Sequence, residues 1–236
     1  MNGPRYDLVL SSGFLAFARQ AGFLEAVEQL GLAVDGVCGT SSGALAGALW
    51  ASGRPAAEVA DILSERPPWK LMRFNPRFWT GIFQMDEVVE LLEGLLPATF
   101  AELPRTFAVG VVRPDGAHGL VQEGPLPAAV AASCAMPWVF APVQLPIGPC
   151  RDGGALDRVA LTPWRRLRGQ RPTLVHHVER TAGADVSFPT EGVTIARTPR
   201  SGARFWSLGD FDGQRAEARA LSLAALQAGV NGGGGG

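Results

Sequence analysis

The sequence predicts a three-layer α/β/α fold with a mostly parallel central sheet. Two observations lead to this prediction. Short β-prone segments alternate along the chain with segments in which apolar residues recur at helical spacing, an alternation typical of parallel sheets covered by helices on both faces. The chain also has 236 residues, 47% of them hydrophobic, which is enough to bury a substantial core.

Short apolar runs rich in β-prone residues predict the strands. Pro114-Asp115-Gly116 lies between the predicted strands 106–112 and 119–122 and is typical of a turn. The second of these strands is therefore expected to follow the first directly. The predicted strands cover residues 6–10, 34–38, 106–112, 119–122, 173–178 and 193–196.

Helical spacing and favourable starting residues predict the helices. Pro55 suits the first position of a helix, and Asp86 can cap another whose first turn is acidic. Small residues dominate two of the predicted helices, which favours close packing on the sheet. The helices are predicted from residue 17 to near 31, over 43–49, from 55, from 86, over 127–134 and over 214–228.

Neither an internal repeat nor a linker divides the sequence, so a single domain is expected over residues 1–231. The terminal glycines 232–236 are expected to form a disordered tail, because glycine runs do not order themselves.

Composition and charge exclude several classes of function. Net charge is −1, which gives no field for a polyanion, so nucleic acid is not expected as a partner. No apolar window of about 18 residues or more predicts a membrane span, and the first residues lack the apolar region of a signal peptide. A cytoplasmic location is therefore expected, with Cys38, Cys134 and Cys150 as buried free thiols. Three scattered histidines predict no metal site, and no cofactor is expected.

Gly39-Thr40-Ser41-Ser42-Gly43 is the segment most typical of catalysis. It follows an apolar strand and precedes a predicted helix, so Ser41 is expected on a sharp strand-to-helix turn that exposes its hydroxyl. The start of that helix aims unpaired N–H groups at the same point, and the two glycines lack the Cβ atoms that would block the turn. Ser41 is therefore the candidate nucleophile.

A serine hydroxyl needs a neighbouring base, and two candidates follow along the chain. His176 fits the order Ser…Asp…His of an α/β-hydrolase triad. Two observations count against it: in that fold the serine turn follows several strands, whereas Ser41 follows only the second, and His176 and His177 are adjacent within an apolar strand. One of the two histidines is expected to face solvent and the other a helix. Asp152 precedes Gly153 and Gly154, which allows a tight loop that holds the carboxylate; an ordinary Asp-Gly turn is the alternative.

Four blocks of the sequence decide between these candidates. Their order and approximate spacing resemble the patatin-like phospholipases, and the resemblance extends over about residues 5–228. The blocks are Ser11–Leu24, Gly39–Leu45, Ala132–Pro137 and Asp152–Asp157.

The resemblance implies a lipid acyl hydrolase with a patatin-like fold and a Ser–Asp dyad. Ser41 would be the nucleophile and Asp152 the general base, in a site dry enough to raise the pKa of the carboxyl. The reaction would pass through an acyl-Ser41 intermediate. Backbone N–H groups of Gly13, Phe14 and Ser42 would form the oxyanion hole.

The chain departs from the family pattern at two loops. The loop after the first strand, Ser11 to Ala16, keeps only Gly13 of the usual glycine run, and Asp157-Arg158-Val159-Ala160 stands where the family has Asp-Asn-x-Pro. The alternative hypothesis is therefore a catalytically weak or inactive protein of the same fold that binds lipid or has a regulatory role.

The segment from Pro67 to Met85 combines large apolar residues with Lys70, Arg73 and Arg77. One interpretation is an acyl-chain channel with a lipid-facing lid that contacts a membrane surface peripherally. The other is a satellite core packed over a helical insertion.

Three aromatic residues are candidates for contact with an acyl chain. Trp79 belongs to this segment, and Trp138 and Phe140 follow the third block of the resemblance, near the expected mouth of the site. Core packing is equally compatible with Phe140.

Overall fold

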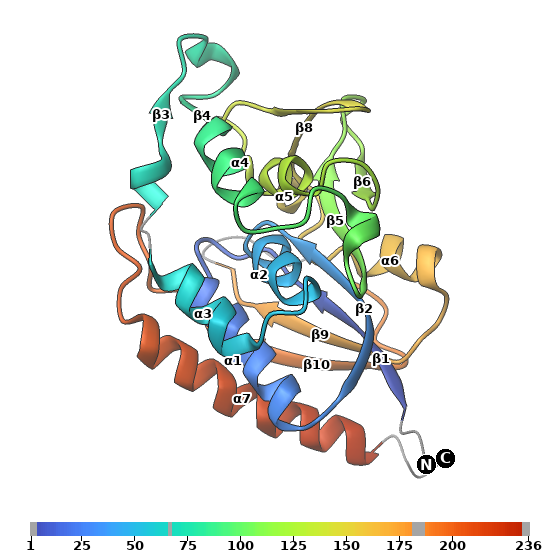
Figure 1. The fold of residues 1–236 in the computed structure, drawn as a ribbon. Coiled ribbons are helices and arrows are strands. Elements are labelled where there is room, and N and C mark those ends of the chain that lie inside the picture. Colours follow the sequence, from blue (N-terminus) through green and yellow to red (C-terminus); the bar gives the residue numbers. More distant parts are fainter. Residues whose placement is uncertain (1–3, 66–67, 181–186, 233–236) are drawn as a thin grey trace.

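The structure is a computed structural model that describes residues 4–65, 68–180 and 187–232 (Figure 1). Within these residues eight strands form one sheet in the order β10-β9-β1-β2-β5-β8-β7, with β6 paired to β5. The strands of this sheet are β1 (Arg5–Leu10), β2 (Ala33–Thr40), β5 (Thr106–Val112), β6 (His118–Val121), β7 (Val143–Leu145), β8 (Gly148–Asp152), β9 (Thr173–Val178) and β10 (Val193–Thr198).

The sheet is mostly parallel, as predicted. All pairings from β10 through β9, β1 and β2 to β5 are parallel, whereas β6, β7 and β8 pair antiparallel at the other edge. The helices are α1 (Phe17–Gln29), α2 (Ser42–Ala51), α3 (Ala56–Glu65), α4 (Asp86–Glu93), α5 (Leu126–Cys134), α6 (Leu161–Arg168) and α7 (Phe211–Gly232).

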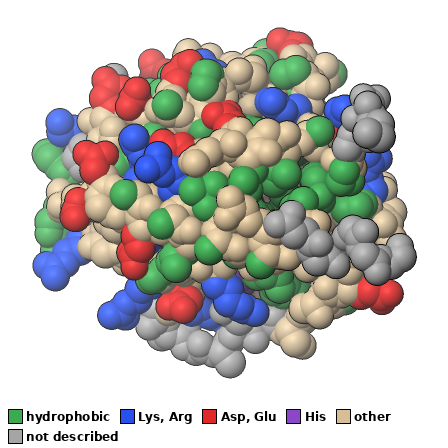
Figure 2. All heavy atoms as spheres, turned by 90° about the horizontal axis from the view of Figure 1, so that it is seen from below, with side chains coloured by type: hydrophobic (Ala, Val, Ile, Leu, Met, Phe, Trp, Pro, Cys, Tyr) green, Lys and Arg blue, Asp and Glu red, His purple; other side chains and the backbone are tan. Residues whose placement is uncertain are grey.

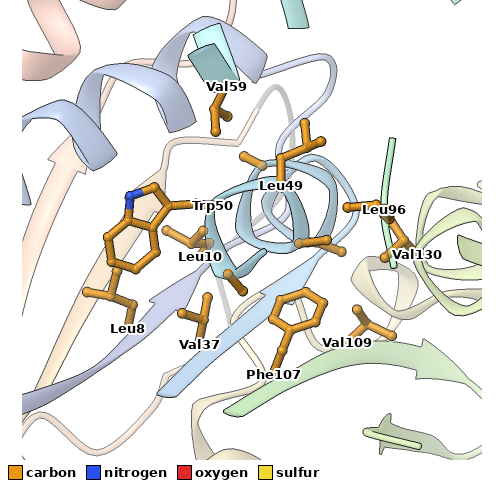
Figure 3. Close-up of a cluster of buried hydrophobic side chains, with 14 of the residues drawn as sticks. Leu8, Leu10, Val37, Leu49, Trp50, Val59, Leu96, Phe107, Val109 and Val130 are labelled. Carbon is orange, nitrogen blue, oxygen red and sulfur yellow. The ribbon is translucent and has the colours of Figure 1, made fainter. Parts of the chain in front are cut away.

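Alternating side chains of the central strands build two hydrophobic cores, one on each face of the sheet. Leu8 and Leu10 point to the larger core, where α1, α2, α5 and α7 pack, and Val9 between them points to a smaller core closed by Trp164 of α6. Figure 3 shows Val37, Phe107 and Val109 of the strands on one side of α2 and Leu49 of α2 on the other, toward Val59 of α3. Helices therefore cover both faces, which confirms the predicted α/β layering.

Two short strands stand apart from the main sheet. β3 (Arg73–Phe74) and β4 (Phe83–Gln84) pair antiparallel and form a hairpin, residues 73–84, that projects from the body at the upper left of Figure 1. We call it the aromatic hairpin.

The elements that the sequence did not predict are β3, β4, β7, β8 and α6. β7 and β8 are short and are separated only by Pro146 and Ile147, and β8 begins with Gly148, so turn-prone residues interrupt the apolar pattern. α6 contains Pro163 and three arginines, which obscure its apolar face. Asp152 consequently ends a strand rather than standing in a loop.

The C-terminal helix is longer than predicted and includes Gly232, the first residue of the predicted glycine tail; residues 233–236 lie outside the described residues. In the part of the chain that the structure describes, no helix combines the length and apolarity needed to span a bilayer.

Candidate active site

Ser41 occupies the predicted turn between β2 and α2. Its φ of 54° and ψ of −120° are sparsely populated for any residue other than glycine. A Cβ at Gly39 would lie 2.4 Å from the carbonyl oxygen of Gly43, and one at Gly43 would lie 2.2 Å from the carbonyl oxygen of Leu10. Both glycines are therefore required by close approach of the backbone, and the turn can form only with glycine at these positions.

The end of α5 holds the strained backbone of Ser41 from two sides. The hydroxyl of Ser133, fully buried, accepts a hydrogen bond from the Ser41 N–H at 2.9 Å and donates to the carbonyl oxygen of Gly110 at 2.7 Å. The thiol of Cys134 donates to the Ser41 carbonyl oxygen at 3.3 Å. These contacts help to offset the cost of the unusual conformation. Nothing in the sequence pointed to these contacts beyond the presence of Ser133 and Cys134 in one of the four blocks.

Asp152 ends β8 and is buried, with 6% of its surface exposed. Its N–H donates to the Ala135 carbonyl oxygen at 3.0 Å, and its carboxylate accepts from the Gly154 N–H at 2.7 Å. Burial raises the pKa of Asp152 to about 6, against the opposing effects of hydrogen bonds from Ser41 and Gly154 and of the charge of Arg158. The carboxyl is therefore a stronger base than an exposed aspartate.

The loop after Asp152 is well anchored although it departs from the family pattern. The Asp157 carboxylate accepts hydrogen bonds from the N–H groups of Val159 and Ala160 at 3.0 and 2.9 Å. Arg158 donates to the carbonyl oxygen of Ser12 at 2.7 Å, and the Ser12 N–H donates back to the Arg158 carbonyl oxygen at 2.7 Å. The loop that carries Asp152 and the loop after β1 are thus joined directly.

Ser41 and Asp152 both line a cavity of about 570 Å³. Most of the other lining side chains are apolar, so the serine and the carboxylate meet in a poorly solvated space. In the view of Figure 2, hydrophobic side chains gather in one region of the molecular surface, with charged side chains around it. The apolar lining comes chiefly from Leu45, Leu49, Ile62, Leu63, Leu71, Met72, Met85, Val88, Leu91, Leu92, Leu95, Met136 and Phe140.

The three predicted oxyanion-hole residues, Gly13, Phe14 and Ser42, also line this cavity. Within the described residues, none of their backbone N–H groups donates to another group of the protein. A Cβ at Gly13 would lie 2.8 Å from the Cβ of Ala16, so this glycine is needed. The left-handed conformation of the loop falls on Leu15, with φ of 47°, and not on Phe14.

The histidines do not take part in the site. His176 and His177 are both buried, so the expectation that one of them faces solvent is wrong. The ring nitrogens of His176 contact Gln20 at 2.7 Å and Thr198 at 2.9 Å, and burial lowers its pKa to about 3. All three histidines of the chain lie within the described residues, and none lines the cavity. The described residues also contain no group of three or more His, Cys, Asp or Glu side chains that could hold a metal ion.

Of the three aromatic residues expected to contact an acyl chain, only Phe140 lines the cavity. Trp138 and Trp79 lie outside its lining and are 86% and 70% exposed. The cavity wall on this side is formed instead by Leu71, Met72 and Met85, which flank the aromatic hairpin in sequence.

The segment around the hairpin is therefore not a satellite core. Trp69, Phe74 and Phe78 are 51%, 65% and 60% exposed, so their rings are not packed in an interior. Leu71, Met72 and Met85 of the same segment line the cavity, and the acyl-chain channel itself stays a prediction.

The fold and the site define the class: an α/β protein with a serine on a strained turn after a central strand and a buried aspartate at the same apolar cavity. The sequence profile described as "Patatin-like phospholipase" matches residues 8–163, more than half of the chain. The chain belongs to the patatin-like phospholipase family.

Relatives in two bacteria match most of the chain. An uncharacterized NTE family protein of Mycobacterium tuberculosis is 30% identical over 167 residues, which are 69% of this chain and 46% of the relative. The uncharacterized protein YqhO of Bacillus subtilis is 26% identical over 202 residues, 71% of this chain and 69% of YqhO. The chain thus spans about half the length of the mycobacterial relative.

Two solved structures share the fold. VipD from Legionella pneumophila superposes with a TM-score of 0.59 at 13% identity, over 98% of this chain and 67% of VipD. The type III secretion effector ExoU of Pseudomonas aeruginosa superposes with a TM-score of 0.57 at 14% identity, over 97% of this chain and 53% of ExoU. At these identities the likeness shows the fold alone.

Proposed function

We propose that this chain is a serine acyl hydrolase that cleaves ester bonds of lipids. One observation carries the proposal: Ser41 and Asp152, from elements far apart in the sequence, line the same apolar cavity, and the carboxylate is buried there with a raised pKa. Membership of the patatin-like phospholipase family supports the same reaction class.

In the proposed reaction, the Ser41 hydroxyl attacks the ester carbonyl carbon while Asp152 accepts its proton. The N–H groups of Gly13, Phe14 and Ser42 stabilise the oxyanion, since they line the cavity and have no other acceptor within the described residues. Asp152 then returns the proton to the leaving alcohol. Water, activated by the same carboxylate, hydrolyses the acyl-Ser41 ester and frees the enzyme.

A carboxyl with a pKa of about 6 suits this role near neutral pH, because it is mostly ionised there and still a useful base. The apolar cavity suits an acyl chain, so phospholipids, lysophospholipids and simpler acyl esters are the proposed substrates. The proposal includes peripheral contact with a membrane surface, where such lipids reside, and requires no cofactor or metal.

A second candidate is a lipid-binding protein of this fold with weak turnover or none. The loop after β1 favours it, because bulky Phe14 lines the cavity and Leu15 adopts a left-handed conformation where a glycine would be unstrained. In this case the cavity would hold lipid while Ser41 remained unreactive.

Hydrolysis of a short-chain nitrophenyl ester, together with mass mapping of fluorophosphonate labelling, tests both candidates. The hydrolase proposal predicts labelling of Ser41 and loss of at least about a thousandfold in kcat/KM in Ser41→Ala. Ser64→Ala changes an exposed serine on α3 and should leave activity unchanged. Undiminished hydrolysis by Ser41→Ala excludes this mechanism, and lipid binding without labelling supports the second candidate.

A further inference from the structure

The aromatic hairpin exposes several large aromatic rings to solvent. Phe74, Phe78 and Trp79 are 65%, 60% and 70% exposed, and the neighbouring Trp138 is 86% exposed. The hairpin projects from the body of the molecule, as Figure 1 shows. Clustered exposed rings of this kind mark an interaction surface.

The segment that carries these rings is itself basic. Residues 67–85 include Lys70, Arg73 and Arg77 and no acidic residue, in a chain whose net charge is −1. Arg73 pairs with Glu87 at 2.6 Å, whereas Lys70 and Arg77 are exposed and form no ion pair within the described residues. Tryptophan and phenylalanine beside unpaired cations are the combination that anionic bilayer surfaces attract.

The hairpin is held in shape by Asn75, which is 4% exposed. Its side-chain amide donates to Thr80 Oγ1 at 2.9 Å and to the Gly81 carbonyl oxygen at 2.8 Å, and its Oδ1 accepts from the Arg77 N–H at 3.0 Å. The exposed rings are therefore presented by a turn that is already ordered, which lowers the entropic cost of binding.

The hairpin is also fixed to the wall of the active-site cavity. The Phe83 N–H donates to the Val139 carbonyl oxygen at 2.9 Å. Arg151, the residue before Asp152, donates to the carbonyl oxygens of Thr80 at 2.8 Å and of Phe140, which lines the cavity, at 3.1 Å. A surface that binds the hairpin is thus held close to the cavity.

We propose that the aromatic hairpin docks the protein on a bilayer that contains anionic lipids. Phe74, Phe78 and Trp79 insert at the interface, and Lys70 and Arg77 face the anionic head groups. The inference rests on the proposed function, since lipid docking serves a lipid substrate. A bilayer is favoured over a protein partner because protruding rings stand beside two cations, Lys70 and Arg77, that form no ion pair within the described residues.

Co-sedimentation with vesicles tests the docking. Ser41→Ala protein, which should not hydrolyse the lipid, is mixed with phosphatidylcholine vesicles that either contain or lack phosphatidylglycerol. Adding Phe78→Ala and Trp79→Ala should weaken binding about tenfold or more, because the two rings would no longer leave water at the bilayer surface. Adding Lys70→Glu and Arg77→Glu should weaken binding about tenfold or more to the anionic vesicles, with little change on neutral ones.

The matched control replaces two exposed leucines on helices distant from the hairpin. Leu167 on α6 and Leu221 on α7 are 41% and 40% exposed, and Figure 1 shows both helices well away from the hairpin. Leu167→Ala with Leu221→Ala should bind vesicles as the parent does.

Three results would overturn the docking proposal: equal vesicle binding by the ring variant and its parent, an equal loss in the leucine control, or a change in the oligomeric state of the lipid-free ring variant with vesicle binding unchanged. Failure of the hydrolase proposal gives a different result. The wild-type protein would then not hydrolyse soluble esters, while its vesicle binding would still depend on the hairpin.

Discussion

The turn at residues 39–43 and the aromatic hairpin differ in how closely the rest of the molecule surrounds them. A Cβ at either glycine of the turn would lie within 2.4 Å of a backbone oxygen, and the Ser41 N–H is held by a buried hydroxyl. The rings of the hairpin are mostly exposed, and buried Asn75 fixes their backbone locally. The turn is a packed interior feature, whereas the hairpin is an ordered surface feature.

Because the turn is packed and the hairpin is exposed, substitutions in the two regions should have different effects. Substitutions around Ser41 should alter folding or turnover of every substrate, because the geometry there leaves no space for adjustment. Substitutions on the hairpin should leave soluble substrates unaffected and alter access to lipid surfaces.

The largest expected effect is that of Gly43→Ala. Its Cβ would lie 2.2 Å from the Leu10 carbonyl oxygen, which belongs to the backbone and cannot rotate away. We expect loss of folded protein or destabilisation by about 4 kcal/mol or more, measured by thermal or urea unfolding. Gly94→Ala is the matched control, since its Cβ would meet only the Leu91 carbonyl oxygen, at 3.5 Å. Equal stability of the two variants would contradict the account of the turn.

Asp152→Asn should stabilise the protein at pH 8. Because burial raises the pKa of Asp152 to about 6, the folded protein carries a costly buried charge above that pH, and the substitution removes it. The gain should reach at most about 3 kcal/mol, shrink as pH falls through about 6, and vanish below about 4, where the carboxyl is neutral in both the folded and the unfolded chain. Urea unfolding across this pH range measures it, and a variant less stable than wild type at pH 8 would contradict the prediction.

Ser133→Ala should lower kcat about tenfold with little change in KM. The Ser41 N–H and the Gly110 carbonyl oxygen both lose a buried partner, at a cost on the order of 1–3 kcal/mol for an unsatisfied group. Cys134→Ala should have a smaller effect, because a thiol is a weak donor. Steady-state kinetics on a soluble ester compares the two, and a larger loss in the cysteine variant would show that Ser133 does not hold the turn.

The smallest effects are expected at the periphery. Phe140→Ala should raise KM for long-chain esters more than for short ones, because Phe140 lines the cavity. Trp138→Ala should change kcat/KM for soluble esters less than about twofold, since its side chain is exposed and lies outside the lining. The opposite order of effects would show that Trp138 contacts the acyl chain.

Local signals made the central strands and the Ser41 turn predictable. The alternating apolar residues of β1, β2 and β5 are packed on both faces, and the two glycines around Ser41 are required by close contacts within the turn itself. The short strands β7 and β8 were missed, because proline and glycine within 143–149 conceal the pairing.

The cavity wall was less predictable, because contacts between distant segments create it. Trp79 and Trp138 have the same residue type as buried Trp50 and Trp164, and only the tertiary structure decides which rings are exposed. The contact between Ser133 and the Ser41 N–H joins residues 92 positions apart, and no short motif announces it.

The rate of fluorophosphonate labelling of Ser41 as a function of pH tests the central claim most directly, because it reports the reactivity of the hydroxyl without a chosen substrate. In the wild-type protein the rate should rise as pH increases through about 6 and level off above it, since only ionised Asp152 accepts the proton. In Asp152→Asn the rate should be at least about a hundredfold lower at pH 8 and should lack this rise. Equal labelling of the two proteins at pH 8 would contradict the dyad.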